Sequence, residues 1–180
     1  MKRILLVAFA LVLVAGVALA DEISVFADQA GSSCTFNFTT PALYNAYVVH
    51  KTVAGATGSQ FKVVNNTGVA FSAVVMNGYL SIGDAFTDLS LAYGGCLAGP
   101  NIAVVQLSGA IFAAPSADCL TIEVVPAPNK VGVLVVGCTF EEIPAYSEPF
   151  QLGSGPTSEC ACITFATEQS TWGRVKSLYR

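Results

Sequence analysis

Charged residues are scarce in this 180-residue sequence: they make up 11% of the chain, against 53% hydrophobic residues. The chain has 8 Lys and Arg and 12 Asp and Glu, which gives a net charge of −4. A protein that binds nucleic acid needs a concentrated basic field, so this balance excludes that class of partner. The hydrophobic content also excludes a disordered chain, which would combine low hydrophobicity with high net charge.

Long hydrophobic runs are absent after residue 20, so we expect no membrane span in the mature chain. The first 20 residues hold 17 hydrophobic residues and follow the pattern of a secretory signal peptide. Lys2 and Arg3 form a basic start, an apolar stretch follows, and Ala18 to Ala20 form a small-residue cleavage site before Asp21. We therefore expect residues 1–20 to be removed and the mature protein to be secreted or held at the cell surface.

Recognisable catalytic and metal motifs are also missing. No Gly-x-Ser-x-Gly turn is present, and the single histidine, His50, ends an expected strand beside Lys51. We expect His50 to be a surface residue rather than a catalytic base. Cys160 and Cys162 are separated by one residue and no Cys-x-x-Cys pair exists, so the sequence predicts neither a metal site nor a cofactor.

The cysteines are even in number and all follow the export signal, which predicts disulfide bonds. They are Cys34, Cys96, Cys119, Cys138, Cys160 and Cys162. Segments 120–125 and 131–136 are typical of two strands joined by a Pro-rich turn, and a hairpin in that register would place Cys119 opposite Cys138. Cys34 and Cys96 would then share Cys160 and Cys162 in either combination.

The mature chain is rich in short β-strand patterns, with alternating polar and apolar residues and many Val, Phe and Tyr residues. Asn77-Gly78 is the strongest hairpin-turn signal, because a type I′ turn needs positive φ at both positions. The expected strands are 34–39, 43–49, 60–64, 69–76, 89–93, 102–112, 119–125, 131–140 and 162–165. This pattern predicts an all-β fold: one disulfide-stapled antiparallel β-sandwich over residues 21–166, immunoglobulin-like or jelly-roll/cohesin-like.

The C-terminal segment 167–180 differs from the rest and predicts a tail or a short amphipathic helix. On a helix Trp172, Val175, Leu178 and Tyr179 would share one face. Two interpretations stay open. The tail packs on its own domain, or it is recognised by a secretion-machinery or cell-surface protein through aromatic and basic anchors. Those anchors would be Trp172, Arg174, Lys176, Tyr179 and Arg180.

One stretch resembles a known family. Tyr44 to His50, followed by Gly58-Ser-Gln-Phe-Lys-Val-Val64, is similar to the opening strands of cohesin-like and carbohydrate-binding-module-like secreted bacterial sandwiches. The resemblance implies a non-catalytic module, but the cysteines depart from cohesins, so it does not extend to dockerin binding. The end of the chain, Trp172 to Arg180, looks like the C-terminal tail of secreted bacterial proteins, which implies a sorting or attachment role.

Together these features predict an exported structural or binding module at the cell surface or in the extracellular space. Two alternatives stay open. A small secreted hydrolase would use Asp84, Asp88 or Glu141, since paired carboxylates can hydrolyse glycosides. A carbohydrate-binding module would instead present exposed aromatic rings to a glycan, and its candidates are Tyr79, Tyr93 and Tyr146.

Overall fold

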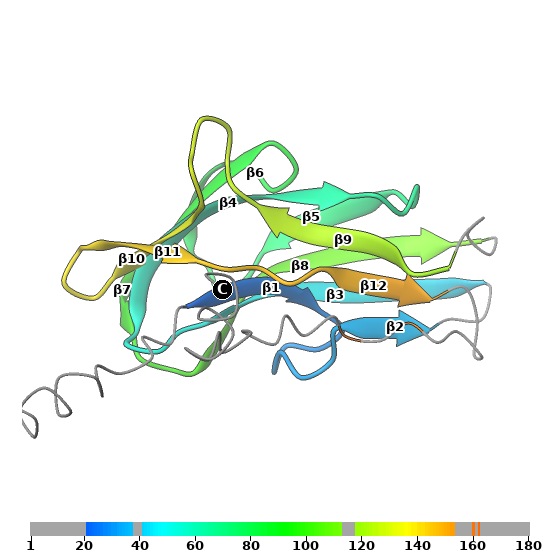
Figure 1. Ribbon diagram of the computed structural model, residues 1–180, viewed down its shortest axis with the longest axis horizontal. Coiled ribbons are helices and arrows are strands. Elements are labelled where there is room, and N and C mark those ends of the chain that lie inside the picture. The colour runs from blue at the N-terminus through cyan, green and yellow to red at the C-terminus, as the bar shows by residue number, and fades with distance from the viewer. Residues whose placement is uncertain (1–20, 38–40, 113–117, 154–159, 161, 163–180) are drawn as a thin grey trace, which may run out of the picture.

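Two β-sheets lie face to face and enclose an apolar core (Figure 1). The computed structural model describes residues 21–37, 41–112, 118–153, 160 and 162, and this part of the chain contains twelve strands and no helix. Of the expected strand 162–165 only Cys162 is described, and it is not in a strand; residues 163–165, the expected C-terminal helix and the signal segment 1–20 lie outside the described ranges. The predicted all-β sandwich is confirmed.

The smaller sheet has four strands in the order β1-β3-β8-β5, with antiparallel neighbours throughout. Its strands are β1 (Glu22–Phe26), β3 (Ala42–Lys51), β5 (Phe71–Val75) and β8 (Asn101–Ile111). In β3 the side chains of Tyr44, Ala46 and Val48 are buried, whereas Leu43 and Asn45 are exposed. This alternation is what a strand with one face on the core requires.

The larger sheet has the order β11-β10-β4-β9-β12-β2, and the β6–β7 hairpin joins it at β4. Its pairs are antiparallel except that β12 and β2 run parallel, a departure from the expected antiparallel fold. Its strands are β2 (Thr35–Asn37), β4 (Ala56–Asn65), β6 (Leu80–Asp84), β7 (Asp88–Leu97), β9 (Leu120–Val125), β10 (Val133–Gly137), β11 (Glu142–Ala145) and β12 (Phe150–Gly153).

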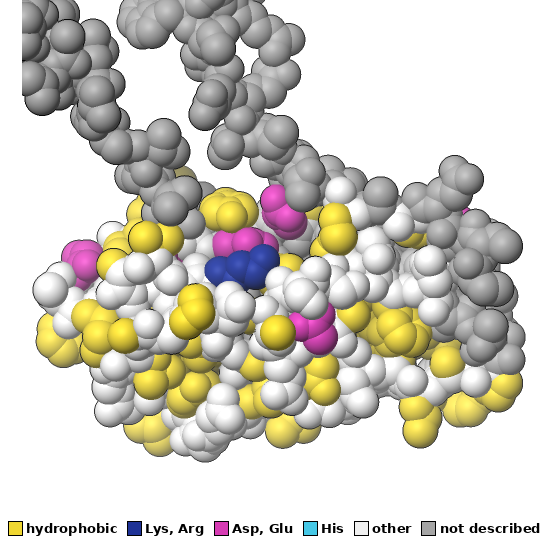
Figure 2. Space-filling view, turned by 90° about the horizontal axis from the view of Figure 1, so that it is seen from below, with side chains coloured by type: hydrophobic (Ala, Val, Ile, Leu, Met, Phe, Trp, Pro, Cys, Tyr) yellow, Lys and Arg dark blue, Asp and Glu magenta, His cyan; other side chains and the backbone are white. Residues whose placement is uncertain are grey.

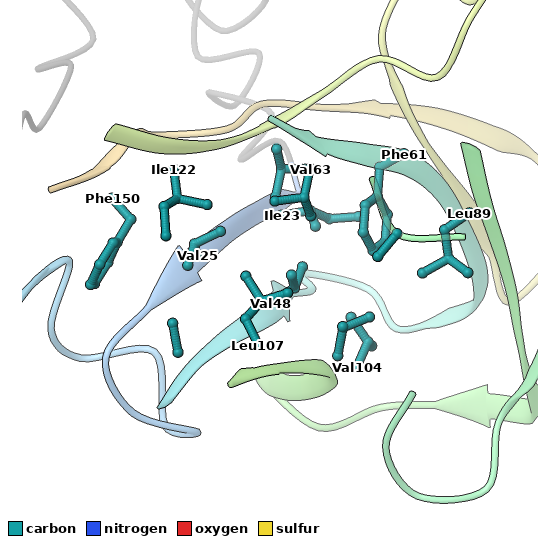
Figure 3. Close-up of a cluster of buried hydrophobic side chains, with 14 of the residues drawn as sticks. Ile23, Val25, Val48, Phe61, Val63, Leu89, Val104, Leu107, Ile122 and Phe150 are labelled. Atoms are coloured by element: carbon teal, nitrogen blue, oxygen red, sulfur yellow. The ribbon is translucent and has the colours of Figure 1, made fainter. Parts of the chain in front are cut away.

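The core lies between the inner faces of the two sheets (Figure 3). Val48 and Leu107 of the smaller sheet pack in one cluster with Phe61, Ile122 and Phe150 of the larger one, and all five side chains are buried. Burying a side chain of this size contributes about 1.5–3 kcal/mol. The apolar alternation noted in the sequence therefore accounts for how the sheets stay together.

The predicted hairpin between residues 120–125 and 131–136 is wrong. β9 and β10 do not pair with each other; both run antiparallel to β4, at Lys62 to Asn65 and at Ala56 to Gln60 respectively. The amide of Val63 meets the carbonyl of Ala85 on the opposite edge of β4, so β9 and β10 follow one another along the same edge. The loop 126–132 therefore connects two strands that lie end to end along one edge of β4.

The disulfides correct the predicted Cys119–Cys138 pair. Cys138 is bonded to Cys96, Cys119 is bonded to Cys160, and Cys34 is bonded to Cys162. Their Cα–Cα distances of 5.1, 5.3 and 5.4 Å lie in the usual range for a disulfide. The predicted pair is wrong because it assumed a β9–β10 hairpin. The two strands lie end to end along β4, so Cys119 and Cys138 are at opposite ends and not face to face.

The Asn77-Gly78 turn is confirmed, but the hairpin expected around it is not. Asn77 and Gly78 have φ of 55° and 67°, and the amide of Tyr79 donates to the carbonyl of Met76. However, β5 before the turn pairs with β8 and β6 after it pairs with β7, in the other sheet. The turn therefore carries the chain from one sheet to the other.

Peptide mapping without reduction should recover Cys96 linked to Cys138 and Cys119 linked to Cys160. Changing both Cys96 and Cys138 to Ser should lower the free energy of unfolding by about 3–4 kcal/mol, because a long loop is released in the unfolded chain. Denaturant unfolding of the mature protein measures the loss. Recovery of a Cys119–Cys138 peptide would contradict the β9–β10 arrangement.

Candidate functional site

A chain of hydrogen-bonded polar side chains crosses the interior between the two sheets. His50 at the end of β3 lies 3.1 Å by its Nε2 from Oδ2 of Asp21, and 3.1 Å by its Nδ1 from the Tyr93 hydroxyl of β7. The Tyr93 and Ser59 hydroxyl groups are hydrogen-bonded at 2.8 Å, and Oδ1 of Asp21 accepts the amide of Val53. Every one of these four side chains is buried, with His50 fully so.

The surroundings of His50 decide its protonation. Burial lowers the pKa of His50 below its ordinary value of 6.5, while the hydrogen bond and charge of Asp21 act in the opposite direction. A carboxylate only accepts hydrogen bonds, so the neutral imidazole carries its proton on Nε2, toward Asp21. Burial likewise raises the pKa of Tyr93, which keeps the phenol neutral.

The hydrogen bonds of this polar chain link the two sheets, and their arrangement differs from that of an acyl-transfer site. The hydroxyl beside the imidazole is the phenol of Tyr93, and Ser59 is hydrogen-bonded to Tyr93 and not to His50, so these residues do not form a serine–histidine pair. The expectation that His50 is a surface residue is wrong. Its alternation with the buried residues Ala46 and Val48 is the sequence signal that could have placed it inside.

The acidic candidates lie apart from this interior. Asp84 and Asp88 are register partners at the end of the β6–β7 hairpin. Oδ1 of Asp84 accepts the amide of Phe86, and Oδ1 of Asp88 accepts the side-chain amide of Gln60. Glu141 is exposed and is hydrogen-bonded by Thr139 in its own turn. These carboxylates therefore occupy turns, and the structure does not bring Glu141 together with the aspartates in a shared cleft.

The three candidate tyrosines do not form one exposed platform. Tyr93 is buried in the polar chain, and the half-buried Tyr79 packs on it with ring centroids 5.0 Å apart. Tyr146 is 46% exposed, its hydroxyl donates to Glu22, and burial raises the pKa of Tyr146 to about 12. A glycan could therefore stack on Tyr146 but not on Tyr93.

The cysteine cluster does not supply metal ligands. Asp118, Cys119 and Cys160 place an oxygen and two sulfur atoms close together, but the two sulfurs are joined in a disulfide and are not thiolates. The tail candidates Trp172, Arg174, Lys176, Tyr179 and Arg180 lie outside the described residues. In the described ranges, no helix is long and apolar enough to cross a membrane.

The outer face of the larger sheet is apolar where β6, β7, β4 and β10 lie side by side. The strand registers align one row of outward residues across the sheet: Leu80, Ala92, Gly58, Val136 and Glu142. The next row is Ile82, Ser90, Gln60, Leu134 and Pro144. Leu80 and Ile82 are 74% and 80% exposed, so two large apolar side chains of β6 face the solvent on this sheet.

A groove of about 490 Å³ lies on this face over Gly58. Ala92, Gly94 and Gly95 of β7 line one side, and Val136 and Phe140 line the other. The Cys96–Cys138 disulfide lines the groove as well, and Phe140 beside it is 79% exposed.

Gly58 has no side chain to fill the groove, and β7 lies so close that only glycine fits at this position. A Cβ atom at this position would lie 2.5 Å from the carbonyl oxygen of Leu91, which is too close for any other residue. The paired strands therefore leave a notch in the sheet face. We call this feature the Gly58 groove.

Charge is unevenly distributed along the chain. The described residues contain three basic side chains, Lys51, Lys62 and Lys130, against ten carboxylates. On the face drawn in Figure 2, one basic group lies between acidic groups amid apolar and uncharged side chains. Lys51 pairs with Glu22 at 3.1 Å. The described part of the protein is therefore acidic, and three of the chain's eight basic residues lie in segment 171–180.

Comparison with known proteins gives structural neighbours only. No family model matches the sequence, and no curated protein matches it. A type II cohesin domain from the cellulosome of Acetivibrio cellulolyticus covers 74% of this chain and 95% of its own, with 13% identity and a TM-score of 0.47. The sixth cohesin of scaffoldin B of the same organism, solved with a Cel5 dockerin mutant, covers 74% and 98%, with 12% identity and a TM-score of 0.45. Likeness at this level concerns the arrangement of strands and not their function.

The buried polar chain makes stability depend on pH. Because the pKa of His50 is lowered in the folded state, the unfolded chain binds a proton below about pH 6.5 that the folded chain does not, so the free energy of unfolding falls as the pH drops below that value. His50 is the only histidine, so one imidazole NMR signal reports its titration. A midpoint at or above 6.5 would contradict the buried, neutral assignment.

Proposed function

We propose that this protein is an exported, non-catalytic binding or structural module that works in the extracellular space or at the cell surface. Three disulfides support an oxidising compartment, since such bonds persist outside the reducing cytosol. The signal-peptide pattern of residues 1–20 supports the same location.

The observation that carries the non-catalytic part is where the reactive side chains lie. His50, Tyr93 and Ser59 are hydrogen-bonded to one another through their imidazole, phenol and hydroxyl groups. All three side chains are buried in the core, away from any substrate in solution. A catalytic base must come within hydrogen-bond distance of its substrate. What the protein offers to solvent instead is the apolar sheet face with the Gly58 groove, which suits contact with another polypeptide.

The C-terminal segment 171–180 serves, in this proposal, to attach the protein to its partner. Residues 171–180 carry the only tryptophan and the basic residues Arg174, Lys176 and Arg180, without an acidic residue. Aromatic and basic anchors dominate the binding energy of protein interfaces. The cell-surface or secretion-machinery partner expected from the sequence stays a prediction.

We expect no turnover of glycoside, ester or peptide substrates by the mature protein. Asp84→Asn, Asp88→Asn and Glu141→Gln should leave any background rate unchanged, because these carboxylates serve turns. Rate assays on the wild type and the three variants, with thermal melts as the folding control, provide the measurement. A rate that exceeds the uncatalysed reaction and disappears in Asp84→Asn or Asp88→Asn would favour the hydrolase.

Deleting residues 167–180 should leave export intact but release the protein from the site where the full chain is retained. Cell fractionation of the full-length and shortened chains measures this, and the three disulfides, mapped in both, control for folding. Unchanged location and partner recovery would remove the attachment role.

A further inference from the structure

Building on the proposed role as a binding module, we infer that the Gly58 groove is the docking site for the C-terminal segment 171–180 of a copy of this chain. The groove and the segment are complementary in polarity and charge. The occupant is thus supplied by the protein itself.

The Gly58 groove offers an apolar notch, and segment 171–180 contains large apolar side chains that could fill it. The Gly58 groove is lined mainly by Ala92, Val136, Phe140 and the Cys96–Cys138 disulfide, and the exposed Leu80 is the register partner of Ala92 on the neighbouring strand. Segment 171–180 contains Trp172, Val175, Leu178 and Tyr179. Aromatic side chains bury the most apolar area and prefer such pockets, so Trp172 is the residue that the notch accommodates.

The second match is electrostatic. The row that contains Gly58 ends at the exposed Glu142, and Glu141 follows Phe140 directly in the chain. No Lys or Arg stands in either outward row of this face. Arg174, Lys176 and Arg180 of the segment therefore meet an apolar floor with an acidic rim, which favours this segment over acidic or neutral ones.

A short tether joins the segment to the sandwich. The Cys34–Cys162 disulfide anchors the chain nine positions before Thr171, with eight residues between. An extended chain spans up to about 3.3–3.6 Å per residue, so the tether covers roughly 30 Å, about the length of a ten-residue strand. A tether of this length keeps the segment close to the sandwich, which gives it a high effective concentration there.

Trp172 is the only tryptophan, which makes the test direct. In the intact mature protein its fluorescence emission should lie at shorter wavelength than in a free peptide 171–180, because docking removes the indole from water. Dilution then shows whose segment is bound: an unchanged spectrum means the chain's own, and a shift toward the free peptide means a neighbour's. Either result supports docking.

Affinity is measured on the full mature chain carrying Trp172→Ala, which contains no tryptophan, by titration with the native peptide 171–180. Phe140→Ser or Leu80→Ser in that background should weaken binding by about tenfold, the factor expected for losing one large apolar contact. Leu43→Ser is the matched control, since Leu43 is 86% exposed on the other sheet. A peptide with Arg174→Glu and Lys176→Glu should also bind more weakly.

Two results would overturn the inference. One is an emission spectrum of the intact protein identical to that of the free peptide, together with no saturable peptide binding. The other is binding that Phe140→Ser and Leu80→Ser, shown by thermal melts to be folded, leave as tight as Leu43→Ser does. Neither result touches the proposed non-catalytic role, which depends on the turnover assays and not on the occupant of the groove.

Discussion

Strand β4 holds the larger sheet together, because both of its edges are paired along most of its length. β7 occupies one edge, while β10 and then β9 occupy the other. Its inward residues Phe61 and Val63 belong to the core, and its outward residue Gly58 opens the groove on the opposite face. One strand therefore sets both the packing inside and the surface that another polypeptide can contact.

The buried polar chain adds specificity to that packing. Apolar contacts between two sheets tolerate small displacements, whereas the hydrogen bonds from Asp21 through His50 and Tyr93 to Ser59 need fixed distances. Asp21 lies directly before β1, His50 near the end of β3, Tyr93 in β7 and Ser59 in β4. The same low-dielectric interior that strengthens these bonds makes a broken one costly, so the sheets have one favoured alignment.

Local patterns in the sequence predicted local structure, and the errors concern pairings between distant segments. Alternating residues predicted most strands, and Asn77-Gly78 predicted its turn, because both depend on neighbouring backbone geometry. The same signals do not say which strand a segment pairs with. Residues 120–125 and 133–137 have the composition of a hairpin, yet each segment pairs with β4 instead of with the other. Because they do not face each other, Cys119 is bonded to Cys160 and not to Cys138. The groove was missed because it depends on a glycine whose neighbours come from three strands.

Asp21 has a consequence for the order of events during export. It is the residue expected to follow the cleaved bond, and it is 3% exposed, with its carboxylate held by His50 and by the amide of Val53. The next five residues form the buried strand β1. A peptidase needs an extended, accessible chain on both sides of the bond it cuts. If residues 1–20 are removed after Ala20, as the sequence predicts, the cut would have to precede the docking of β1, and its timing would set when the smaller sheet is completed.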